Sequence, residues 1–312
     1  MSKNPFGRGG WTPARLPDLT GTTTVITGAN SGIGLEAATE LAGRGTHQIW
    51  LCRNEGKAAA ARDAVLSQQP EASITILPMD LSDLDSVSAA AQRVLSMTEG
   101  IHALINNAGI MMLPTREQTA QGFEKQIGVN HFGHFALNAQ LAERVEAVGG
   151  RFVSVASVAH RGGTLHRDDL FFDSGYGAIK AYGQSKLANI LYIRELDRRL
   201  EAAGCSSQAI ACHPGYSATN LQTTGPSKLW GAVMKVTNAI VAQGADRGAW
   251  PTLLAAFDPE AERGGYYGPT GMGETRGAVG PAGVASQATN ADDQKWLWEK
   301  SVELTGLSFA IL

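Results

Sequence analysis

A short β-branched segment, a glycine-rich turn and a helix follow one another near the start of the chain, at residues 22–27, 28–34 and 35–43. The glycines of the turn are spaced G-x-x-x-G-x-G. Glycines let a backbone approach a ligand closely, and the first turn of a helix offers free N–H groups and a positive dipole to an anion. The pattern predicts a cradle for a nucleotide pyrophosphate, and an ordinary strand-to-helix turn is the alternative. The residues assigned to the cradle are Gly28, Asn30, Ser31, Gly32, Ile33 and Gly34.

Strands and helices alternate along the chain up to about residue 213. Further strands are expected at residues 48–52, 73–78, 102–106, 151–156, 207–212 and 265–267, and helices at residues 55–69, from 84, at 123–141, 178–203, 246–257 and 291–305. This alternation predicts an α/β fold, a single Rossmann-like, doubly wound parallel sheet of about seven strands with helices on both faces.

The domain organisation follows from this alternation. One domain is expected to span residues 18–312, with a cofactor half at 18–157 and substrate-facing segments at 158–181 and 220–245. Residues 1–17 are rich in glycine and proline and are expected to form a flexible arm.

Composition excludes several classes of protein. The 312 residues carry a net charge of −3 without a dense run of Lys or Arg, so nothing favours binding to nucleic acid. No window approaches the roughly 18 consecutive apolar residues of a membrane-spanning helix, and residues 1–17 lack the apolar core of a secretory signal. Cys52, Cys205 and Cys212 are odd in number and lack metal-ligand spacing, which predicts a reduced, cytoplasmic chain.

The second strand ends at Arg53 and Asn54, where a dinucleotide-binding fold places the adenosine ribose. An acidic residue there would bind the 2′-hydroxyl and repel a 2′-phosphate, whereas the guanidinium fork of Arg suits a phosphate. We therefore expect NADP(H) rather than NAD(H) as the cofactor. A surface Arg at a strand end is the alternative.

The ends of the third and fourth strands carry further candidate residues. Asp80, which precedes Leu81, is placed either to contact the adenine edge or to cap the helix that begins near residue 84. Asn106 and Asn107 end a buried strand and need hydrogen-bond partners, so they are expected to tie neighbouring strand ends together. The small residues after them that would let a cofactor pass are Ala108 and Gly109.

The candidate proton-transfer residues lie on the helix that begins near residue 178, where Tyr182 and Lys186 are four residues apart and leave the same face. A phenol with a pKa of about 10 is a poor acid or base at neutral pH. A fixed ammonium one turn away favours the phenolate and moves that pKa toward the working range. The pair can therefore pass a proton to or from an alcohol or ketone, although Tyr and Lys at this spacing also occur by chance.

Two further residues extend this candidate site. Ser157 follows a strand at the ligand edge of the sheet, where its hydroxyl can bond a substrate carbonyl, and no G-x-S-x-G elbow surrounds it. Asn130 lies within a helix, where it would either hold a water in a proton relay or bond a local carbonyl. His131 and His134 lack a carboxylate at matching spacing, so no metal site is expected.

The chain beyond the last parallel strand is expected to face the substrate. Pro214 and Gly215 force a turn at the ligand edge of the sheet. Residues 223–243 carry apolar side chains at helical spacing, which fits a lid over substrate, an oligomer contact or a membrane-surface helix, with core or lid packing favoured. Residues 268–287 are rich in glycine and are expected to form a mobile loop.

Together these segments resemble the short-chain dehydrogenase/reductase family, in the family's order and over nearly the whole chain. The matching pieces are Thr27-Gly-Ala-Asn-Ser-Gly-Ile-Gly34, Asn106-Asn-Ala-Gly109, Asn130, Ser157, Tyr182-x-x-x-Lys186 and Pro214-Gly215. Within the family, the sequences of several motifs are most similar to the retinol dehydrogenase and protochlorophyllide reductase branch. The segments that carry this finer resemblance are Ile127-Gly-Val-Asn-His-Phe-Gly-His-Phe135, Ser157-Val-Ala-His160, Tyr182-Gly-Gln-Ser-Lys-Leu-Ala-Asn-Ile190 and His213-Pro-Gly215.

The resemblance implies a role for each matching residue. Tyr182 would be the general acid/base, and Lys186 would lower its pKa and bond the nicotinamide ribose. Ser157 would orient the substrate oxygen, and Asn130 would complete a water relay to Lys186. Thr219, in the family's Pro-Gly-x-x-x-Thr pattern, would hold the carboxamide or diphosphate of the cofactor.

These observations favour an NADP-dependent oxidoreductase that interconverts a lipophilic alcohol with its ketone or aldehyde, and Arg53 matches the family members that prefer NADP. One alternative is an NADPH-dependent reductase of a conjugated C=C bond. An alternative of another class is an NADP-binding regulatory protein without turnover, against which the complete set of acid/base residues argues. The expected partner is a small alcohol or carbonyl compound, and the resemblance suggests a homodimer or homotetramer.

Overall fold

The computed structural model describes residues 4–215 and 244–312, which form an α/β fold around one eight-stranded sheet. The strand order is β3-β2-β1-β4-β5-β6-β7-β8, parallel from β3 to β7. The strands are β1 (Thr23–Thr27), β2 (His47–Cys52), β3 (Ile74–Pro78), β4 (Ala103–Asn106), β5 (Arg151–Val155), β6 (Gln208–Cys212), β7 (Tyr266–Gly271) and β8 (Arg276–Pro281). The chain order reverses between β1 and β4, and open α/β sheets bind ligands at the carboxyl ends of the strands beside such a reversal. The predicted doubly wound parallel sheet is confirmed.

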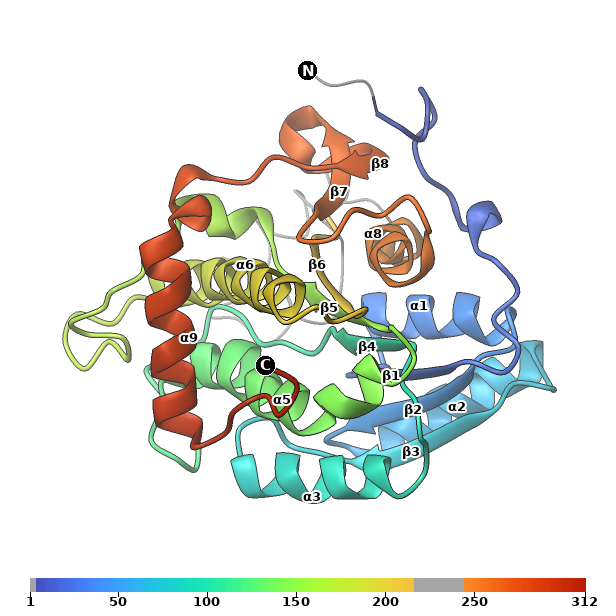
Figure 1. Ribbon diagram of the computed structural model, residues 1–312, viewed down its shortest axis with the longest axis horizontal. Coiled ribbons are helices and arrows are strands. Elements are labelled where there is room, and N and C mark those ends of the chain that lie inside the picture. Colours follow the sequence, from blue (N-terminus) through green and yellow to red (C-terminus); the bar gives the residue numbers. More distant parts are fainter. Residues whose placement is uncertain (1–3, 216–243) are drawn as a thin grey trace.

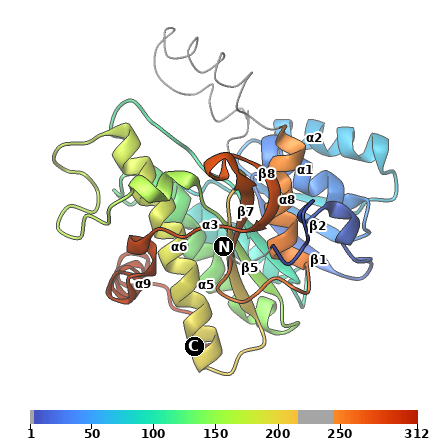
Figure 2. The same ribbon diagram turned by 90° about the horizontal axis from the view of Figure 1, so that it is seen from above.

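Helices cover both faces of the sheet (Figures 1 and 2), with α1, α2 and α8 on one side and α3, α5, α6 and α9 on the other. The helices are α1 (Gly32–Ala42), α2 (Glu55–Gln68), α3 (Leu84–Leu95), α4 (Lys125–Ile127), α5 (Gly133–Glu146), α6 (Ala178–Ala202), α8 (Ala245–Phe257) and α9 (Ala291–Thr305). Alternate strand residues enter opposite cores, since Leu104 packs with the α5 side and Ile105 with the α1 side. Within the two described ranges, none of the helices has the length and apolar character needed to cross a lipid bilayer.

The helix expected at residues 123–141 differs from a regular α-helix. It begins at Lys125, because the Glu124 carboxylate accepts the N–H groups of Gln126 and Ile127 at 3.0 Å each. Its second segment, η2 (Gly128–Phe132), is a π-helix in which the Gly133 N–H donates to the Gly128 carbonyl. Such π segments in α-helices frequently mark functional sites, and this one contains the candidate residue Asn130.

Residues 268–287 were expected to be a mobile loop, and that prediction is wrong for most of the segment. Strand β7 continues to Gly271, and β8 pairs with it in antiparallel register, Tyr267 opposite Pro281 and Gly268 opposite Gly280. The glycine-rich sequence of β8 has weak strand propensity of its own. The N-terminal segment stabilises β8 in this position, because the Trp11 N–H donates to the Val279 carbonyl at 2.9 Å.

Residues 4–17 of the predicted flexible arm pack against the body of the protein instead. Trp11 is fully buried, and its indole Nε1–H donates to Asp258 Oδ2 at 2.7 Å. Arg15, in a short 3-10 helix (Pro13–Arg15), pairs with the same Asp258 oxygen at 2.9 Å. The apolar burial of Trp11 and Leu16 offsets the entropy lost in ordering this segment.

Candidate active site

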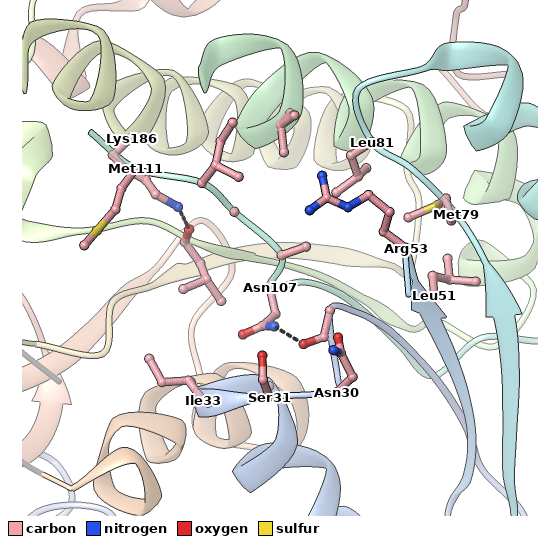
Figure 3. A pocket seen from close by; sticks show the side chains of 18 of the residues that line it. Asn30, Ser31, Ile33, Leu51, Arg53, Met79, Leu81, Asn107, Met111 and Lys186 are labelled. Carbon is pink, nitrogen blue, oxygen red and sulfur yellow. Dashed lines mark hydrogen bonds between the residues drawn. The ribbon is translucent and has the colours of Figure 1, made fainter. Parts of the chain in front are cut away.

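A cavity of about 310 Å³ lies at the carboxyl edge of the sheet, over the ends of β1, β2, β4 and β5 (Figure 3). It brings together most of the residues predicted for cofactor binding, although they come from distant parts of the chain. Those that line it are Gly28, Asn30, Ser31, Gly32, Ile33, Gly34, Arg53, Asp80, Leu81, Asn107, Ala108, Gly109, Tyr182, Lys186 and Pro214.

Five predicted residues are not part of the cavity wall as described. The side chain of Asn54 instead caps α2. Asn130 lies beside Lys186 and Ser157 beside Tyr182, with the contacts described below. Gly215 follows the lining residue Pro214. Thr219 lies outside the described residues, as do residues 220–243 of the segment 220–245 and all of the segment 223–243.

The glycine-rich turn has the shape of an anion cradle. Gly28 and Gly32 adopt positive φ angles of 68° and 55°, which favour glycine. A Cβ at Gly34 would lie 2.3 Å from Asn107 Nδ2 and 2.6 Å from the Gly28 carbonyl oxygen. Ser31 makes no side-chain cap hydrogen bond to α1 in the described structure, so the first N–H groups of the helix remain available to an anion. These features fit the pyrophosphate of a dinucleotide.

A Gly34→Ala substitution is expected to destabilise the protein by about 1–3 kcal/mol and to weaken NADPH binding, because the new methyl group would meet a backbone oxygen that cannot turn away. Gly56→Ala is the matched control. A Cβ at Gly56, in α2, would meet only Asn54 Oδ1 at 3.6 Å, so this variant should be neutral or more stable by up to about 1 kcal/mol. Thermal unfolding and NADPH titration of both variants measure the effect, and a Gly34→Ala protein with wild-type values would contradict the tight packing.

The loop after β4 is fixed to the end of β1 by Thr27. Its hydroxyl oxygen accepts the N–H groups of Asn107 at 3.0 Å and Ala108 at 2.9 Å. The Asn107 amide donates to the Thr27 carbonyl at 2.9 Å, so this Asn ties the two strand ends together as predicted. Asn106 does not, since neither atom of its buried amide has a hydrogen-bond partner among the described residues.

Lys186 and Tyr182 lie one turn apart on α6, with the ammonium nitrogen 5.9 Å from the centre of the phenol ring. Lys186 Nζ donates to the Val155 carbonyl at 2.8 Å, and the Asn189 amide donates to the same oxygen at 3.2 Å. Burial lowers the pKa of Lys186 to about 8. The ammonium is therefore held at the end of β5, with one edge on the cavity.

The pKa of Tyr182 differs from the value expected from the sequence. Burial of the phenol raises it above its ordinary value, and a hydrogen bond with the Ser157 side chain lowers it in part. The predicted lowering of this pKa does not occur, because desolvation penalises the phenolate more strongly than the Ser157 hydrogen bond favours it. Ser157 thus lies within hydrogen-bond reach of the Tyr182 hydroxyl, as a group that orients a substrate oxygen must.

Asn130 is held by hydrogen bonds at its side-chain amide. Its Oδ1 accepts the Ile110 N–H and its Nδ2 donates to the Ile110 carbonyl, both at 2.9 Å. Nδ2 also donates to Ser185 Oγ at 2.9 Å. A Cβ built at Gly109 would lie 3.1 Å from Asn130 Oδ1 and 3.5 Å from Lys186 Nζ, so these two side chains meet at the loop that lines the cavity.

Arg53 and Asp80 lie at neighbouring strand ends. Arg53 directly follows β2 and is exposed, and Figure 3 shows its guanidinium extending into the cavity beside Leu81. Asp80 also lines the cavity, and its Oδ1 accepts the Ser82 N–H at 2.9 Å and hydroxyl at 2.7 Å. The alternative role of Asp80 as a helix cap is wrong, because α3 is capped by Asp83.

Sequence reasoning missed several residues of the site. The lining residues not predicted are Leu51, Met79, Ile110, Met111, Lys125, Val129, Val155 and Ala156. Three of them, Met79, Val155 and Ala156, end a strand or directly follow one, so the carboxyl-edge rule could have found them. Lys125 and Val129 gave no such signal. The supporting residues Thr27, Ser185 and Asn189 act through side chains that meet only in the folded protein.

Comparison with known proteins places this geometry in a family. Residues 22–229 match the family described as short chain dehydrogenase. The chain is 36% identical over 294 residues to retinol dehydrogenase 12 of Mus musculus, covering 93% of this chain and 88% of the relative. It is 34% identical over 295 residues to the chloroplastic short-chain dehydrogenase TIC 32 A of Brassica napus, covering 90% and 88%. The crystal structure of an uncharacterized protein from Mycobacterium paratuberculosis shares 39% identity and a TM-score of 0.80, covering 96% and 99%.

The chain belongs to the short-chain dehydrogenase family and, within it, to the retinol dehydrogenase-like branch predicted from its motifs. It is an NAD(P)-dependent oxidoreductase that acts on alcohol or carbonyl groups.

Proposed function

We propose that the protein is an NADP-dependent oxidoreductase that interconverts a lipophilic alcohol with its aldehyde or ketone, with Tyr182 as the general acid/base. The observation that carries the proposal is that Tyr182 and Lys186 line the same cavity as the exposed Arg53, with the Ser157 side chain hydrogen-bonded to the Tyr182 phenol. The relatives named retinol dehydrogenase support a lipophilic alcohol as the substrate class. A cytoplasmic location and assembly as a homodimer or homotetramer remain predictions.

In this proposal the chain holds the cofactor through residues of both cavity ends. The turn Gly28–Gly34 and the first N–H groups of α1 take the diphosphate, and Arg53 takes the 2′-phosphate. Lys186 bonds the nicotinamide ribose, and Thr219 is expected to contribute from outside the described residues. NADP(H) supplies or accepts the hydride when bound.

The proton is handled by the chain's own side chains. Ser157 donates a hydrogen bond to the substrate oxygen and keeps it beside the Tyr182 hydroxyl. Tyr182 donates its proton to that oxygen in the reducing direction and accepts it in the oxidising direction. The positive charge of Lys186 stabilises the phenolate that forms, and Asn130, beside Lys186 at Gly109, would complete a relay that returns the proton.

An Arg53→Ser variant is expected to bind NADPH about 10- to 100-fold more weakly while NADH binding stays unchanged, because only NADPH carries the phosphate that the guanidinium pairs with. Arg62→Ser is the matched control, since Arg62 is a half-buried arginine of α2 that pairs with Asp63 and is absent from the cavity wall. Titration followed by nicotinamide fluorescence gives the four dissociation constants. If the wild-type protein binds NADH as tightly as NADPH, the assignment of NADP(H) as the preferred cofactor is wrong.

A further inference from the structure

His134, in the first turn of α5, contacts both halves of the site although it reaches no part of the cavity wall. Its side chain is buried, with an exposed fraction of 3% for the residue. Nε2 lies 2.9 Å from Thr27 Oγ1, and Nδ1 lies 3.1 Å from the main-chain carbonyl oxygen of Asn130. Each ring nitrogen therefore meets a different part of the site.

The direction of these hydrogen bonds follows from Thr27. Its hydroxyl oxygen already accepts the N–H groups of Asn107 and Ala108, which uses both lone pairs. The hydroxyl proton is then left to donate, and His134 Nε2 at 2.9 Å is a better acceptor than the Ile105 carbonyl at 3.5 Å. Nε2 is thus unprotonated, and Nδ1–H donates to the Asn130 carbonyl.

The imidazole stays neutral, so this one arrangement of donor and acceptor is fixed. Burial, with a smaller contribution from the nearby charge of Lys186, lowers the pKa of His134 to about 4, although the hydrogen bond to the Asn130 carbonyl raises it in part. A neutral ring with one donor and one acceptor can join two groups without changing its charge during turnover.

The two groups joined in this way belong to different functions of the site. Thr27 fixes Asn107 and Ala108, which line the cofactor cavity. Asn130 bonds Ser185 Oγ, which in turn donates to the carbonyl of Tyr182 at 2.8 Å. The chain of hydrogen bonds therefore runs from the cofactor loop through the imidazole to the helix that carries the proton donor.

We propose that His134 is a positioning residue that holds the cofactor loop through Thr27 and the relay residue Asn130 through its carbonyl, and so sets their mutual distance. The proposal rests on the roles assigned above to Asn130 and to the loop that contains Asn107. Its two contacts are chemically separable, because the amide nitrogen of Asn occupies the place of Nδ1 and the amide oxygen of Gln the place of Nε2.

The experiment compares His134→Asn with His134→Gln. The Asn variant keeps the donor to the Asn130 carbonyl and loses the acceptor for Thr27, so NADPH should bind about tenfold more weakly with kcat nearly retained. The Gln variant keeps the acceptor and loses the donor, so kcat should fall about tenfold with NADPH affinity nearly retained. The readouts are the NADPH dissociation constant and the single-turnover and steady-state rates.

His131 supplies the matched control. It lies three residues earlier in η2, is buried to 1% exposure, and bonds Ser301 of α9 rather than a group of the site. The same two substitutions at His131 should leave the NADPH dissociation constant and kcat within about threefold of wild type. Neither His131 variant should change one of these two quantities without the other.

Opposite shifts in the two His134 variants support the inference. Equal losses of affinity and kcat in both, or no loss in either, would assign His134 to general stability and overturn it. If one His134 variant does not fold, the other is compared with the same substitution at His131, and it must still shift only the quantity expected of it. This inference can fail while the proposed function stands. If activity requires Tyr182 but the two His134 variants show no opposite shifts, only the role of His134 is rejected.

Discussion

A Tyr182→Phe variant is expected to lose about 10²- to 10⁴-fold in kcat while NADPH affinity changes less than about threefold, because the substitution removes the proton and leaves the cavity wall in place. The Ser157 side chain bonds the phenol, and Lys186 lies one turn away, so no neighbouring group takes over the transfer in the same position. Steady-state rates with an aldehyde and NADPH, together with NADPH titration, separate the chemical step from cofactor binding.

Tyr192→Phe provides the comparison on the same helix. Tyr192 is buried, and its hydroxyl accepts a hydrogen bond from Asn138 Nδ2 at 2.8 Å, away from the cavity. Its loss should lower stability by about 1–3 kcal/mol, because the Asn138 amide is left without a partner, and should leave kcat nearly unchanged. A Tyr182→Phe protein with wild-type kcat would contradict the acid/base role, whereas loss of NADPH binding would move Tyr182 to the cofactor alone.

The residues that sequence reasoning placed correctly are those whose chemistry is local. The G-x-x-x-G-x-G turn and the pair Tyr182 and Lys186 are each contained in a few consecutive residues, and their spacing fixes which side chains share a face. The carboxyl-edge rule for parallel sheets then brings these segments to one site without knowledge of the packing. The cavity lined by Gly28, Gly34, Tyr182 and Lys186 follows from these two steps.

The remaining features depend on contacts between distant segments, which no local pattern shows. Strand β8 exists because β7 and Trp11 pair with it, and the N-terminal segment is ordered because Trp11 and Arg15 reach Asp258. The pKa of Tyr182 is another case. Spacing along a helix predicted that Lys186 lowers this pKa, whereas burial of the phenol, which is a property of the folded chain, raises it.

The free energy of unfolding is expected to fall by several kcal/mol as the pH is lowered from 7 to 4, because His131 and His134 are buried as neutral rings. Burial lowers the pKa of His131 to about 3 and that of His134 to about 4, below the value of about 6.5 in an unfolded chain. Between these values the unfolded state binds more protons than the folded state. The stabilisation is therefore complete above about pH 6.5 and is lost as the pH falls, with a limit of about 1.4 kcal/mol per pH unit for each ring.

A His131→Gln variant isolates the contribution of one ring. Ser301 Oγ donates to the Leu297 carbonyl at 2.7 Å, so its contact with His131 Nε2 at 2.8 Å is a bond that the ring donates, and the amide nitrogen of Gln can replace it. The variant keeps this hydrogen bond but cannot titrate. Its unfolding free energy should depend on pH less steeply than that of wild type by up to about 1.4 kcal/mol per unit between pH 4 and 6.5.

Urea unfolding at a series of pH values measures this difference, and the subtraction removes the groups common to both proteins. Glu124 and Asp197, whose carboxyl pKa values are raised by burial, act in the opposite direction, since the folded state binds their protons more readily.

His47→Gln is the matched control, because His47 is only partly buried and hydrogen-bonded to Ser73, so burial lowers its pKa in a more hydrated site. Equal pH slopes for wild type and His131→Gln would mean that His131 is able to take up its proton without unfolding, through a local opening of η2 against α9.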